Sequence, residues 1–266
     1  MTAENGYTTL RVETAGPVAS VTLNRPDVRN AFDEAMIAEL TRVFGSFEAG
    51  GDRRAVVLSG EGKTFCAGAD VNWMRRAASF SPEENREDAR RMARMLRTID
   101  TSPLPVIGKI RGAAIGGGVG LAAVCDIAIA AAGTVFSLAE VKLGILPAAI
   151  SPYVLRAIGA RSARDCFLTG ERFDAAEARR IGLVHAVVDE ADLDAAVGRK
   201  VDALLSSGPE AVAAAKSLID RVSGLEIDEA FPVTADAIAE RRASAEGQEG
   251  LSAFLEKRRP SWFRSR

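Results

Sequence analysis

The order of strand-like and helix-like segments constrains this fold more than any other feature of the sequence. Through the first two-thirds of the chain, short apolar runs typical of buried strands alternate with segments that have helical apolar spacing. The last third is almost entirely helix-like. We therefore expect an α/β core over residues 1–200 and a C-terminal helical region over residues 201–266.

Apolar patterns and turn residues place the individual elements. Short β-type runs predict strands at residues 17–23, 55–59, 105–110, 126–130 and 135–138. Apolar residues at helical spacing predict helices at residues 32–49, 82–99, 152–158, 175–181, 193–205, 209–222 and 227–243. No internal repeat or long linker interrupts this order.

The charge balance disfavours a general nucleic-acid binder. The 266 residues include 34 basic and 36 acidic side chains, for a net charge of −2. A run of arginines between Arg86 and Arg97 is interleaved with Glu83, Glu84, Glu87 and Asp88, which is typical of a solvated helix face. We expect no nucleic-acid partner.

Cysteine and histidine usage excludes several classes of enzyme. The three cysteines are far apart and lack a CxxC spacing, so we expect no disulfide framework and a reducing, cytoplasmic location. With His185 as the only histidine, a zinc or iron site has almost no ligands to draw on. His185 lies in the strand-like run IGLVHAVV, which favours a structural role over that of a hydrolase base.

One segment, residues 113–132, invites a membrane interpretation. It is small and apolar, and it carries a GxxxG pair formed by Gly116 and Gly120. It is mostly Ala and Gly, however, and Asp126 lies inside it, so its insertion into a bilayer is unfavourable. The N-terminus also lacks the basic and apolar regions of a signal peptide. We predict a buried helix followed by a strand in a soluble core, with no membrane partner.

Two glycine-rich loops, each between a predicted strand and a helical pattern, carry the main functional signal. They are residues 65–70, FCAGAD, and residues 112–120, GAAIGGGVG. Small residues let a ligand approach the backbone, and a helix N-terminus presents unpaired N–H groups to negative charge. Two such groups on one oxygen would form an oxyanion hole. Tight turns and close packing are the simpler alternative.

A dinucleotide-binding fold is the main rival explanation of the second loop. Glu140 follows Gly120 by about twenty residues, as a ribose-binding acid would. That acid should end the strand after the helix, whereas the predicted strand 126–130 runs into Ala131, Ala132 and Gly133. The spacing in GGGVGL also fails to complete GxGxxG, so we disfavour this fold.

Six ordered motifs carry a family resemblance: NRPDVRNAF, GKTFCAGAD, GAAIGGGVGLAAVCDIAIA, SLAEVKLGILP, FLTGERFDAAEARRIGLVHAVV and AFLEKRRPSW. In content, order and spacing they resemble the enoyl-CoA hydratase/isomerase (crotonase) superfamily. The resemblance implies a crotonase-like α/β spiral of ββα units with a C-terminal helical trimerisation subdomain. It also implies an acyl-CoA substrate and a homotrimer or a homohexamer built as a dimer of trimers.

The resemblance also assigns site residues. The amides of Ala69 and Gly117 match the family's oxyanion hole, and Glu140 matches a catalytic glutamate. Positions that match the coenzyme A binding site are Arg29, Ala31, Ala67, Ala69, Asp70, Val71, Gly117, Gly120, Phe254 and Lys257. No separate cofactor is implied, because coenzyme A is part of the substrate.

Some of these positions have a second possible role. Arg25, Arg29 and Lys63 are suitable phosphate partners for the polyanionic coenzyme A. Phe254 and Lys257 match residues that reach the coenzyme A of a neighbouring subunit, although the basic run there is also typical of an ordinary surface. Trp73 and Met74 are candidates for the wall of the acyl pocket or for the core.

Gly120 is the main departure from the family, whose hydratases have a second glutamate at that position. Glu140 is then the only catalytic carboxylate, and its apolar neighbours in sequence predict a raised pKa. The family's GAGGTQRL is also replaced by AAISPYVL, which resembles the bacterial methylglutaconyl-CoA hydratase subgroup. Gly120 would then leave room for a branched or carboxylated acyl group, whose own carboxylate orients the water.

Three functions remain open on these grounds. The first is a lyase that adds water across the α,β double bond of an acyl-CoA similar to 3-methylglutaconyl-CoA, with Glu140 as acid and base. The second is a Δ3,Δ2-enoyl-CoA isomerase in which Glu140 carries a proton between two carbons. The third is a non-catalytic scaffold that binds coenzyme A.

Overall fold

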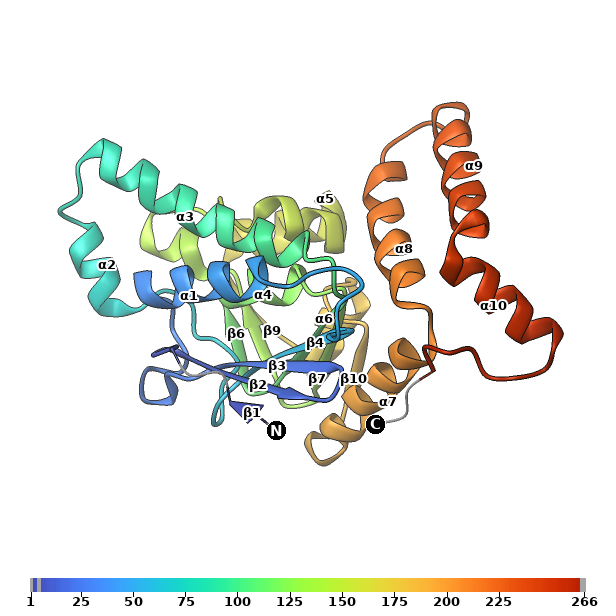
Figure 1. The fold of residues 1–266 in the computed structure, drawn as a ribbon. Coiled ribbons are helices and arrows are strands. Elements are labelled where there is room, and N and C mark those ends of the chain that lie inside the picture. The colour runs from blue at the N-terminus through green and yellow to red at the C-terminus, as the bar shows by residue number, and fades with distance from the viewer. Residues whose placement is uncertain (1, 4–5, 264–266) are drawn as a thin grey trace.

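A central sheet and the helices that cover it form the core of the computed structural model, and a helical arm extends from it (Figure 1). The structure describes residues 2–3 and 6–263. The outermost positions of the two predicted regions, residues 1, 4–5 and 264–266, lie outside the described residues.

Strands of the described residues form two sheets. The larger has the order β1-β2-β3-β4-β5-β7-β10, with antiparallel pairing from β1 to β3 and parallel pairing from β3 to β10. Its strands are β1 (Thr2–Ala3), β2 (Leu10–Ala15), β3 (Val18–Leu23), β4 (Ala55–Gly60), β5 (Val106–Ile110), β7 (Ile127–Ala131) and β10 (Ala186–Val188). The smaller sheet consists of β6 (Ala113–Ile115), β8 (Val135–Ser137) and β9 (Arg172–Asp174), with β6 parallel to β8.

Helices of the core follow these strands, and three more form the arm. The core helices are α1 (Glu34–Gly45), α2 (Val71–Ala77), α3 (Pro82–Asp100), α4 (Gly117–Ala123), α5 (Ser151–Thr169), α6 (Ala175–Arg180) and α7 (Leu193–Ser206). The arm consists of α8 (Pro209–Val222), α9 (Ile227–Ala243) and α10 (Ala245–Leu255). Three 3₁₀ turns complete the list: η1 (Pro26–Val28), η2 (Ala139–Leu143) and η3 (Glu190–Asp192).

Helix α1 shows why these residues adopt helical structure. The side chain of Asp33 caps its N-terminus by accepting a 2.8 Å hydrogen bond from the Met36 N–H. Its apolar face, which includes Leu40 and Phe44, is buried in the main core. The predicted helix over residues 32–49 is therefore confirmed, although it begins and ends within that range.

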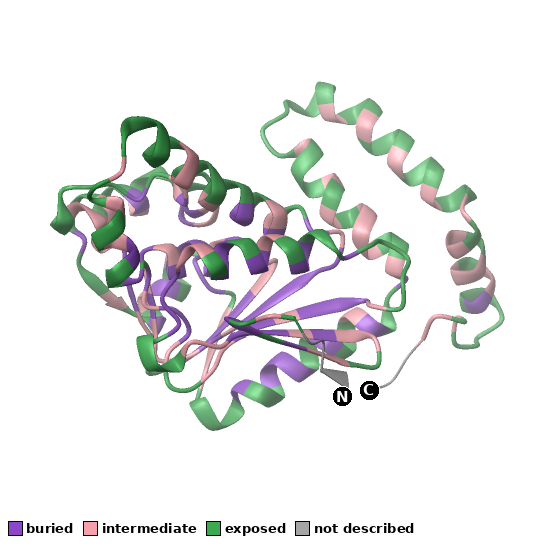
Figure 2. Cartoon of the chain, turned by 60° about the vertical axis from the view of Figure 1, so that its left-hand side comes forward, coloured by how far each residue is buried: buried purple, intermediate pink, exposed green. Residues whose placement is uncertain are grey.

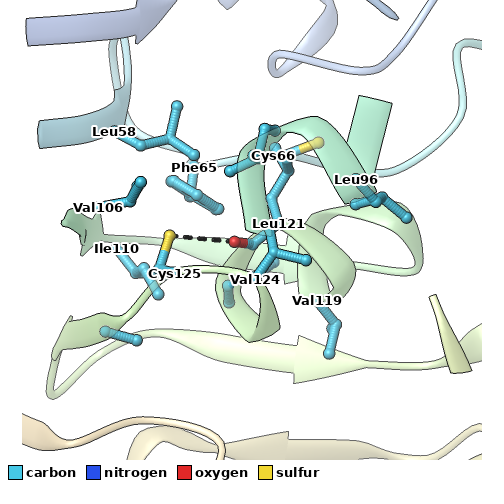
Figure 3. Packing of buried hydrophobic residues seen from close by; sticks show 14 of the residues in the cluster. Leu58, Phe65, Cys66, Leu96, Val106, Ile110, Val119, Leu121, Val124 and Cys125 are labelled. Atoms are coloured by element: carbon cyan, nitrogen blue, oxygen red, sulfur yellow. Dashed lines mark hydrogen bonds between the residues drawn. The ribbon is translucent and has the colours of Figure 1, made fainter. Parts of the chain in front are cut away.

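The core is most tightly packed around α4. Figure 3 shows Leu58, Phe65, Val106 and Ile110 beside this helix, all of them fully buried. Burial of this kind contributes about 25 cal/mol per Å² of apolar surface to folding. This packing fixes α4 in position relative to the sheet.

Residues 113–132 form β6, α4 and β7, which confirms the predicted buried helix followed by a strand. Within the described residues, no helix combines the length and the apolar character that crossing a bilayer requires. Gly116 and Gly120, the GxxxG pair, lie at the start of α4 and are buried in the core of this chain. On α3, Arg86 and Arg91 pair with Glu83 and Glu87, as expected for a solvated face.

Several elements were missed or cut short by the sequence patterns. Strand β2 and helices α2 and α10 were not predicted, because each is short and buries few side chains along one face. Helix α5 was expected to end at Ile158. A true break follows at Gly159, whose φ of 69° and ψ of 162° are not helical, but a second helical stretch continues to Thr169.

The arm is attached to the core mainly through polar contacts. Figure 2 shows that α8 and α9 have no buried face, unlike the strands of the core. Lys216 of α8 donates to Asp126 at 2.8 Å, and Asp126 also accepts from the Val106 N–H at 2.7 Å. Helix α7 crosses the predicted boundary at residue 200 and packs on the sheet. The arm thus begins after Ser206.

Replacing Lys216 with Met is expected to destabilise the protein by about 1–3 kcal/mol near neutral pH, because it leaves the half-buried Asp126 charge without its cationic partner. Burial already raises the pKa of Asp126 above its ordinary value of 3.8, against the opposing effect of Lys216. The penalty should therefore shrink as the pH falls through this raised pKa and Asp126 takes up a proton. Urea unfolding over a series of pH values from neutral to acidic measures this, with the exposed Lys200→Met as the control. Equal effects of the two variants would contradict it.

Candidate active site

The two glycine-rich loops lie against each other as a short parallel ladder. The Cys66 N–H donates to the Ala113 carbonyl at 3.1 Å, and the Ile115 N–H donates to the Cys66 carbonyl at 3.0 Å. One step earlier, the Phe65 N–H donates to the Arg111 carbonyl at 2.9 Å. Because β6 leads directly into α4, this ladder sets where α4 begins relative to the first loop.

Glycine is required where these two backbones touch. A Cβ at Gly118 would overlap the carbonyl of Cys66, and a Cβ at Gly112 would overlap the carbonyl of Lys63. Gly112 also has a φ of +69°, which disfavours other residues. Close packing of loop on loop, the simpler alternative considered for these glycines, therefore accounts for both positions.

The amides of Ala69 and Gly117 are both free to bind a ligand. Phe32 forms a parallel bridge in which its N–H donates to Gly68 at 2.7 Å and its carbonyl accepts from Asp70 at 2.8 Å. In such a bridge the N–H of the middle residue, Ala69, points away from Phe32. Gly117 is the first residue of α4 and has no helical partner for its N–H. Within the described residues, neither amide donates a hydrogen bond.

The structure brings these two amides to the same region. A Cβ at Gly68 would lie only 3.0 Å from the carbonyl oxygen of Ile115. Ala69 is one residue beyond this contact and Gly117 is two residues beyond it. Both amides therefore lie near the N-terminal end of α4, where the resemblance placed the oxyanion hole.

Glu140 follows a strand of the smaller sheet and also lies at the N-terminal end of α4. Strands β6 and β8 run parallel, so the segments that follow them leave the sheet at the same edge. The Gly116 N–H donates to the Ser137 carbonyl at 2.8 Å, and Glu140 follows in η2. A Cβ at Gly116 would lie 3.0 Å from Glu140 Oε1, so the carboxylate rests directly on this glycine. It is then one residue away from the free amide of Gly117.

The Glu140 carboxyl is held in an environment that disfavours its charge. Burial raises its pKa above the ordinary value of 4.5, while a hydrogen bond from its own backbone N–H acts in the opposite direction. Its Oε2 atom is buried and accepts no hydrogen bond from the described residues. A buried carboxylate oxygen without a partner is rare outside functional sites. The predicted rise in pKa is confirmed in direction.

Gly120 does not leave the space that the sequence suggested. A Cβ at this position would overlap Cγ2 of Ile150 and lie 2.9 Å from its Cβ. Ile150 comes from the AAISPYVL segment and is only 3% exposed. The prediction that Gly120 makes room for a larger acyl group is therefore wrong, because a side chain distant in sequence fills that room.

The first loop is held in place by a charged cluster. Arg25 pairs with Asp70 at 2.9 Å and with Asp33 at 3.1 Å, and it donates to the Ala31 carbonyl at 2.6 Å. Burial alone would raise the pKa of Asp70, but N–H groups of α2 and the Arg25 guanidinium hold it below the ordinary value. Asp70 is thus a helix cap and an ion-pair partner, and Arg25 is engaged here rather than free as a phosphate partner.

Asn30 connects this cluster to the loop that precedes the ladder. It is fully buried and has a left-handed φ of 56°. Its amide accepts from the Arg25 N–H at 2.9 Å and donates to the carbonyls of Glu61 and Thr64 at 3.0 and 2.7 Å. One signal in the sequence could have identified Asn30, since Asn adopts left-handed backbone conformations more readily than most residues.

The remaining predicted coenzyme A positions of the core lie around this loop. Arg29, Lys63 and Val71 are exposed, Ala67 is half-buried and Ala31 is buried. The Ala67 N–H donates to the Arg29 carbonyl at 3.0 Å, which places these two residues side by side. Arg29 and Lys63 are thus the exposed cations of the predicted phosphate partners.

Phe254 and Lys257 are not brought to this site within one chain. Phe254 lies at the end of α10 and is 80% exposed, and Lys257 follows that helix with a φ of 58°. Figure 1 shows α10 far from α2 and α4. These residues reach a coenzyme A site only if they serve another subunit.

Two other predicted roles are decided by burial and hydrogen bonding. Trp73 is 9% exposed and belongs to the main core, and Met74 is half-buried beside it in α2. His185 accepts a 3.0 Å hydrogen bond at Nδ1 from the Ala128 N–H and donates its own N–H back to that residue, which confirms a structural histidine. Among the described residues, no three His, Cys, Asp or Glu side chains are grouped to hold a metal ion.

Comparison with known proteins gives one consistent result. The model of the enoyl-CoA hydratase/isomerase family matches residues 13–265. A short-chain-enoyl-CoA hydratase of Clostridium acetobutylicum is 34% identical over 257 residues, which cover 96% of this chain and 97% of that protein. The crystal structure of an enoyl-CoA hydratase from Shewanella pealeana has a TM-score of 0.92 and 45% identity, covering 96% of each chain. Pseudomonas aeruginosa AtuE has a TM-score of 0.93 and 40% identity, covering 97% of this chain and 100% of its own. The crotonase-like α/β fold is thereby confirmed.

Replacing Glu140 with Gln is expected to stabilise the protein at neutral pH by on the order of 1 kcal/mol or less, given its partial exposure. A carboxyl with a raised pKa in the folded state lowers stability as the pH rises through that pKa. The gain should therefore vanish below the ordinary pKa of 4.5. Thermal unfolding of both proteins across this pH range measures it. If the Gln variant were less stable than the wild type at neutral pH, this would contradict a buried environment that disfavours the charge of Glu140.

Replacing Asn30 with Ala is expected to cost about 2–4 kcal/mol of stability, because it removes three buried hydrogen bonds and leaves their backbone partners unsatisfied. Loosening of the first loop should also raise the KM for the substrate. Denaturant unfolding and steady-state kinetics measure the two effects, with Asn24→Ala as the matched control from the same motif. Similar losses in both variants would contradict the role of Asn30.

Proposed function

The chain belongs to the enoyl-CoA hydratase/isomerase family, and we propose that it adds water across the α,β double bond of an acyl-CoA thioester. It is an enzyme of the hydro-lyase type, in keeping with relatives that are named enoyl-CoA hydratases. The observation that carries the proposal is the carboxylate of Glu140 resting on Gly116, beside the free amide of Gly117.

The free amides of Ala69 and Gly117 are proposed to bind the thioester oxygen. When a nucleophile adds at C3 of an unsaturated thioester, negative charge develops on this oxygen. Two fixed N–H donors stabilise that charge without reorganising, and loss of one such donor typically costs about 10²–10³ in rate. The ladder between the loops and the bridge between Phe32 and Ala69 support fixed positions for both donors.

Glu140 is proposed to act first as base and then as acid. As the oxygen of water forms a bond to C3, the carboxylate takes one proton from that water and the π electrons move onto the thioester oxygen. The enolate then collapses, and the Glu140 carboxyl returns the same proton to C2. Its raised pKa favours the first half of this cycle, because it makes the carboxylate a stronger base for the proton of the attacking water. No cofactor is needed for this chemistry.

The acyl group is proposed to be branched and carboxylated, similar to 3-methylglutaconyl-CoA. The segment that contains Ile150 resembles the methylglutaconyl-CoA hydratase subgroup, and Gly120 offers no second carboxylate to orient the water. The distal carboxylate of the substrate is proposed to take that role. A product complex in which this carboxylate points away from C3, or full activity on crotonyl-CoA, would contradict this assignment.

Coenzyme A is proposed to bind across the exposed Arg29 and Lys63, with a neighbouring subunit completing the site. A homotrimer, or a homohexamer made of two trimers, would place Phe254 and Lys257 of one chain at the site of another. The arm supports this assembly, because Ile227 is 86% exposed and Phe231 is 72% exposed on α9. Such apolar side chains are typical of surfaces that a partner covers.

Isomerisation is the second candidate, and Glu140 is the observation that favours it. A single carboxylate can remove a proton from C4 of a β,γ-enoyl thioester and deliver it to C2, with the electrons shifting through the oxyanion. Water is not needed for this reaction. A panel of 3-methylglutaconyl-CoA, crotonyl-CoA and a 3-enoyl-CoA separates the two. Loss of the conjugated ultraviolet absorbance indicates hydration, and its appearance from the 3-enoyl substrate indicates isomerisation.

Replacing Glu140 with Gln is expected to lower kcat by about 10²–10⁴-fold with little change in KM, because it removes the proton carrier but keeps the shape of the site. Glu171→Gln, at an exposed position outside the site, serves as the control. The conjugated thioester absorbance follows turnover in both. Unchanged turnover in the Glu140 variant would contradict the role of Glu140, whereas coenzyme A binding with no turnover by either protein would favour the remaining alternative, a non-catalytic scaffold.

A further inference from the structure

Two glycines at the start of α4, the N-cap Gly116 and Gly120 inside the helix, each contact a side chain from the segment that follows β8. Gly116 and Gly120 are one turn apart, and the Gly120 N–H donates to the Gly116 carbonyl at 3.2 Å. The Glu140 carboxylate rests on Gly116 and the side chain of Ile150 rests on Gly120. Glu140 and Ile150 therefore contact backbone positions four residues apart at the start of α4.

Apolar side chains surround the position where a Cβ of residue 120 would lie. Besides Ile150, the Leu96 side chain of α3 would lie 3.7 Å from a Cβ at position 120. Both side chains are almost fully buried (3% and 0% exposed), and Figure 3 shows Leu96 beside α4 in the packed core. A region of this kind offers a water molecule no polar partner, so it stays dry.

Backbone structure holds Ile150 firmly in this position. It is the residue before the first turn of α5, and its carbonyl accepts from the N–H groups of Tyr153 and Val154 at 3.2 and 3.1 Å. The next residue, Ser151, donates both its N–H and its hydroxyl to the Ala148 carbonyl. These bonds hold the backbone of Ile150 beside Gly120, and the surrounding core confines its side chain.

We propose that Ile150 is a specificity-determining residue of this site, and the inference rests on the proposed function. By filling the face of α4 one turn beyond Glu140, it excludes water and any second acid–base group from that position. Glu140 must then work alone, so a substrate that brings its own polar group to orient water reacts well. A plain enoyl-CoA, which brings none, reacts poorly.

The test adds a carboxylate where Ile150 now lies. The variant Gly120→Glu/Ile150→Ala removes the overlap that Gly120→Glu alone would create and places a second carboxylate beside Glu140. We expect the kcat/KM for crotonyl-CoA hydration to rise about tenfold or more over Ile150→Ala. Adding Glu140→Gln to the double variant should abolish the gain. A folded double variant with less than about a twofold gain would overturn the proposal.

A second comparison decides the question if the double variant does not fold. Ile150→Ala opens the Gly120 face, and Ile158→Ala is its matched control, because it removes the same atoms from a buried position farther along α5. We expect Ile150→Ala to narrow the preference for 3-methylglutaconyl-CoA over crotonyl-CoA by about fivefold, and Ile158→Ala to change it by less than about twofold. Equal preferences in the two variants would overturn the proposal.

Failure of the proposed function would look different. A wild-type protein inactive on every enoyl-CoA, or one unaffected by Glu140→Gln, would contradict the assigned reaction itself. The wild type could instead be active and depend on Glu140, while Ile150→Ala leaves its substrate preference unchanged. That result would be consistent with the proposed reaction and would contradict only the role of Ile150.

Discussion

Close approach between backbones is the constraint on which the rest of this site depends. The first glycine-rich loop lies so near the second that a Cβ at Gly112 or Gly118 would overlap a carbonyl. The same absence of side chains on α4 lets Glu140 and Ile150 rest directly on the helix. Interiors pack at near-crystalline density, so one added carbon at these positions would displace a loop or a reacting group. The positions of the free amides of Ala69 and Gly117 and of the Glu140 carboxylate follow from this contact.

Asp70 and Glu140 show how the surroundings of a carboxyl group set its pKa. Asp70 and Glu140 both have buried carboxyl groups, yet their pKa values move in opposite directions. Asp70 receives two backbone N–H groups and the Arg25 guanidinium, which stabilise its charge and make it a structural anchor. Glu140 receives little compensation for its burial, so its proton is held more tightly and can be exchanged with a substrate. Asp70 thereby holds the first loop, which carries the free amide of Ala69.

The helical arm leaves apolar surface uncovered within a single chain. Its helices α8 and α9 bury no residue within the chain, and polar pairs such as Lys216 with Asp126 provide much of its attachment. Large apolar side chains on α9 and α10 remain exposed, and so do the two C-terminal positions that the family resemblance assigns to coenzyme A. A single chain therefore carries Glu140 and the two free amides, while the arm exposes apolar side chains of the kind that a partner covers.

The sequence by itself determined the order of elements, the α/β class and Glu140 as the candidate acid–base residue. Periodicity and turn residues are local properties, and long patterned segments such as residues 227–243 were predicted with their correct bounds. Elements with few buried side chains, including β2 and α2, were missed because they carry too little apolar pattern. The family resemblance singled out Glu140 and the amides of Ala69 and Gly117, but it could not say what contacts each of them.

Only the tertiary structure decided what occupies the space around the site. Gly120 suggested an open pocket in the sequence, and the structure fills that space with Ile150, thirty residues later in the chain. Arg25 suggested a phosphate partner, and the structure pairs it with Asp70 and Asp33. The physical reason is the same in both cases. The type of a residue limits the interactions that its side chain can make. Its actual partner depends on contacts between segments distant in sequence, which local patterns do not contain.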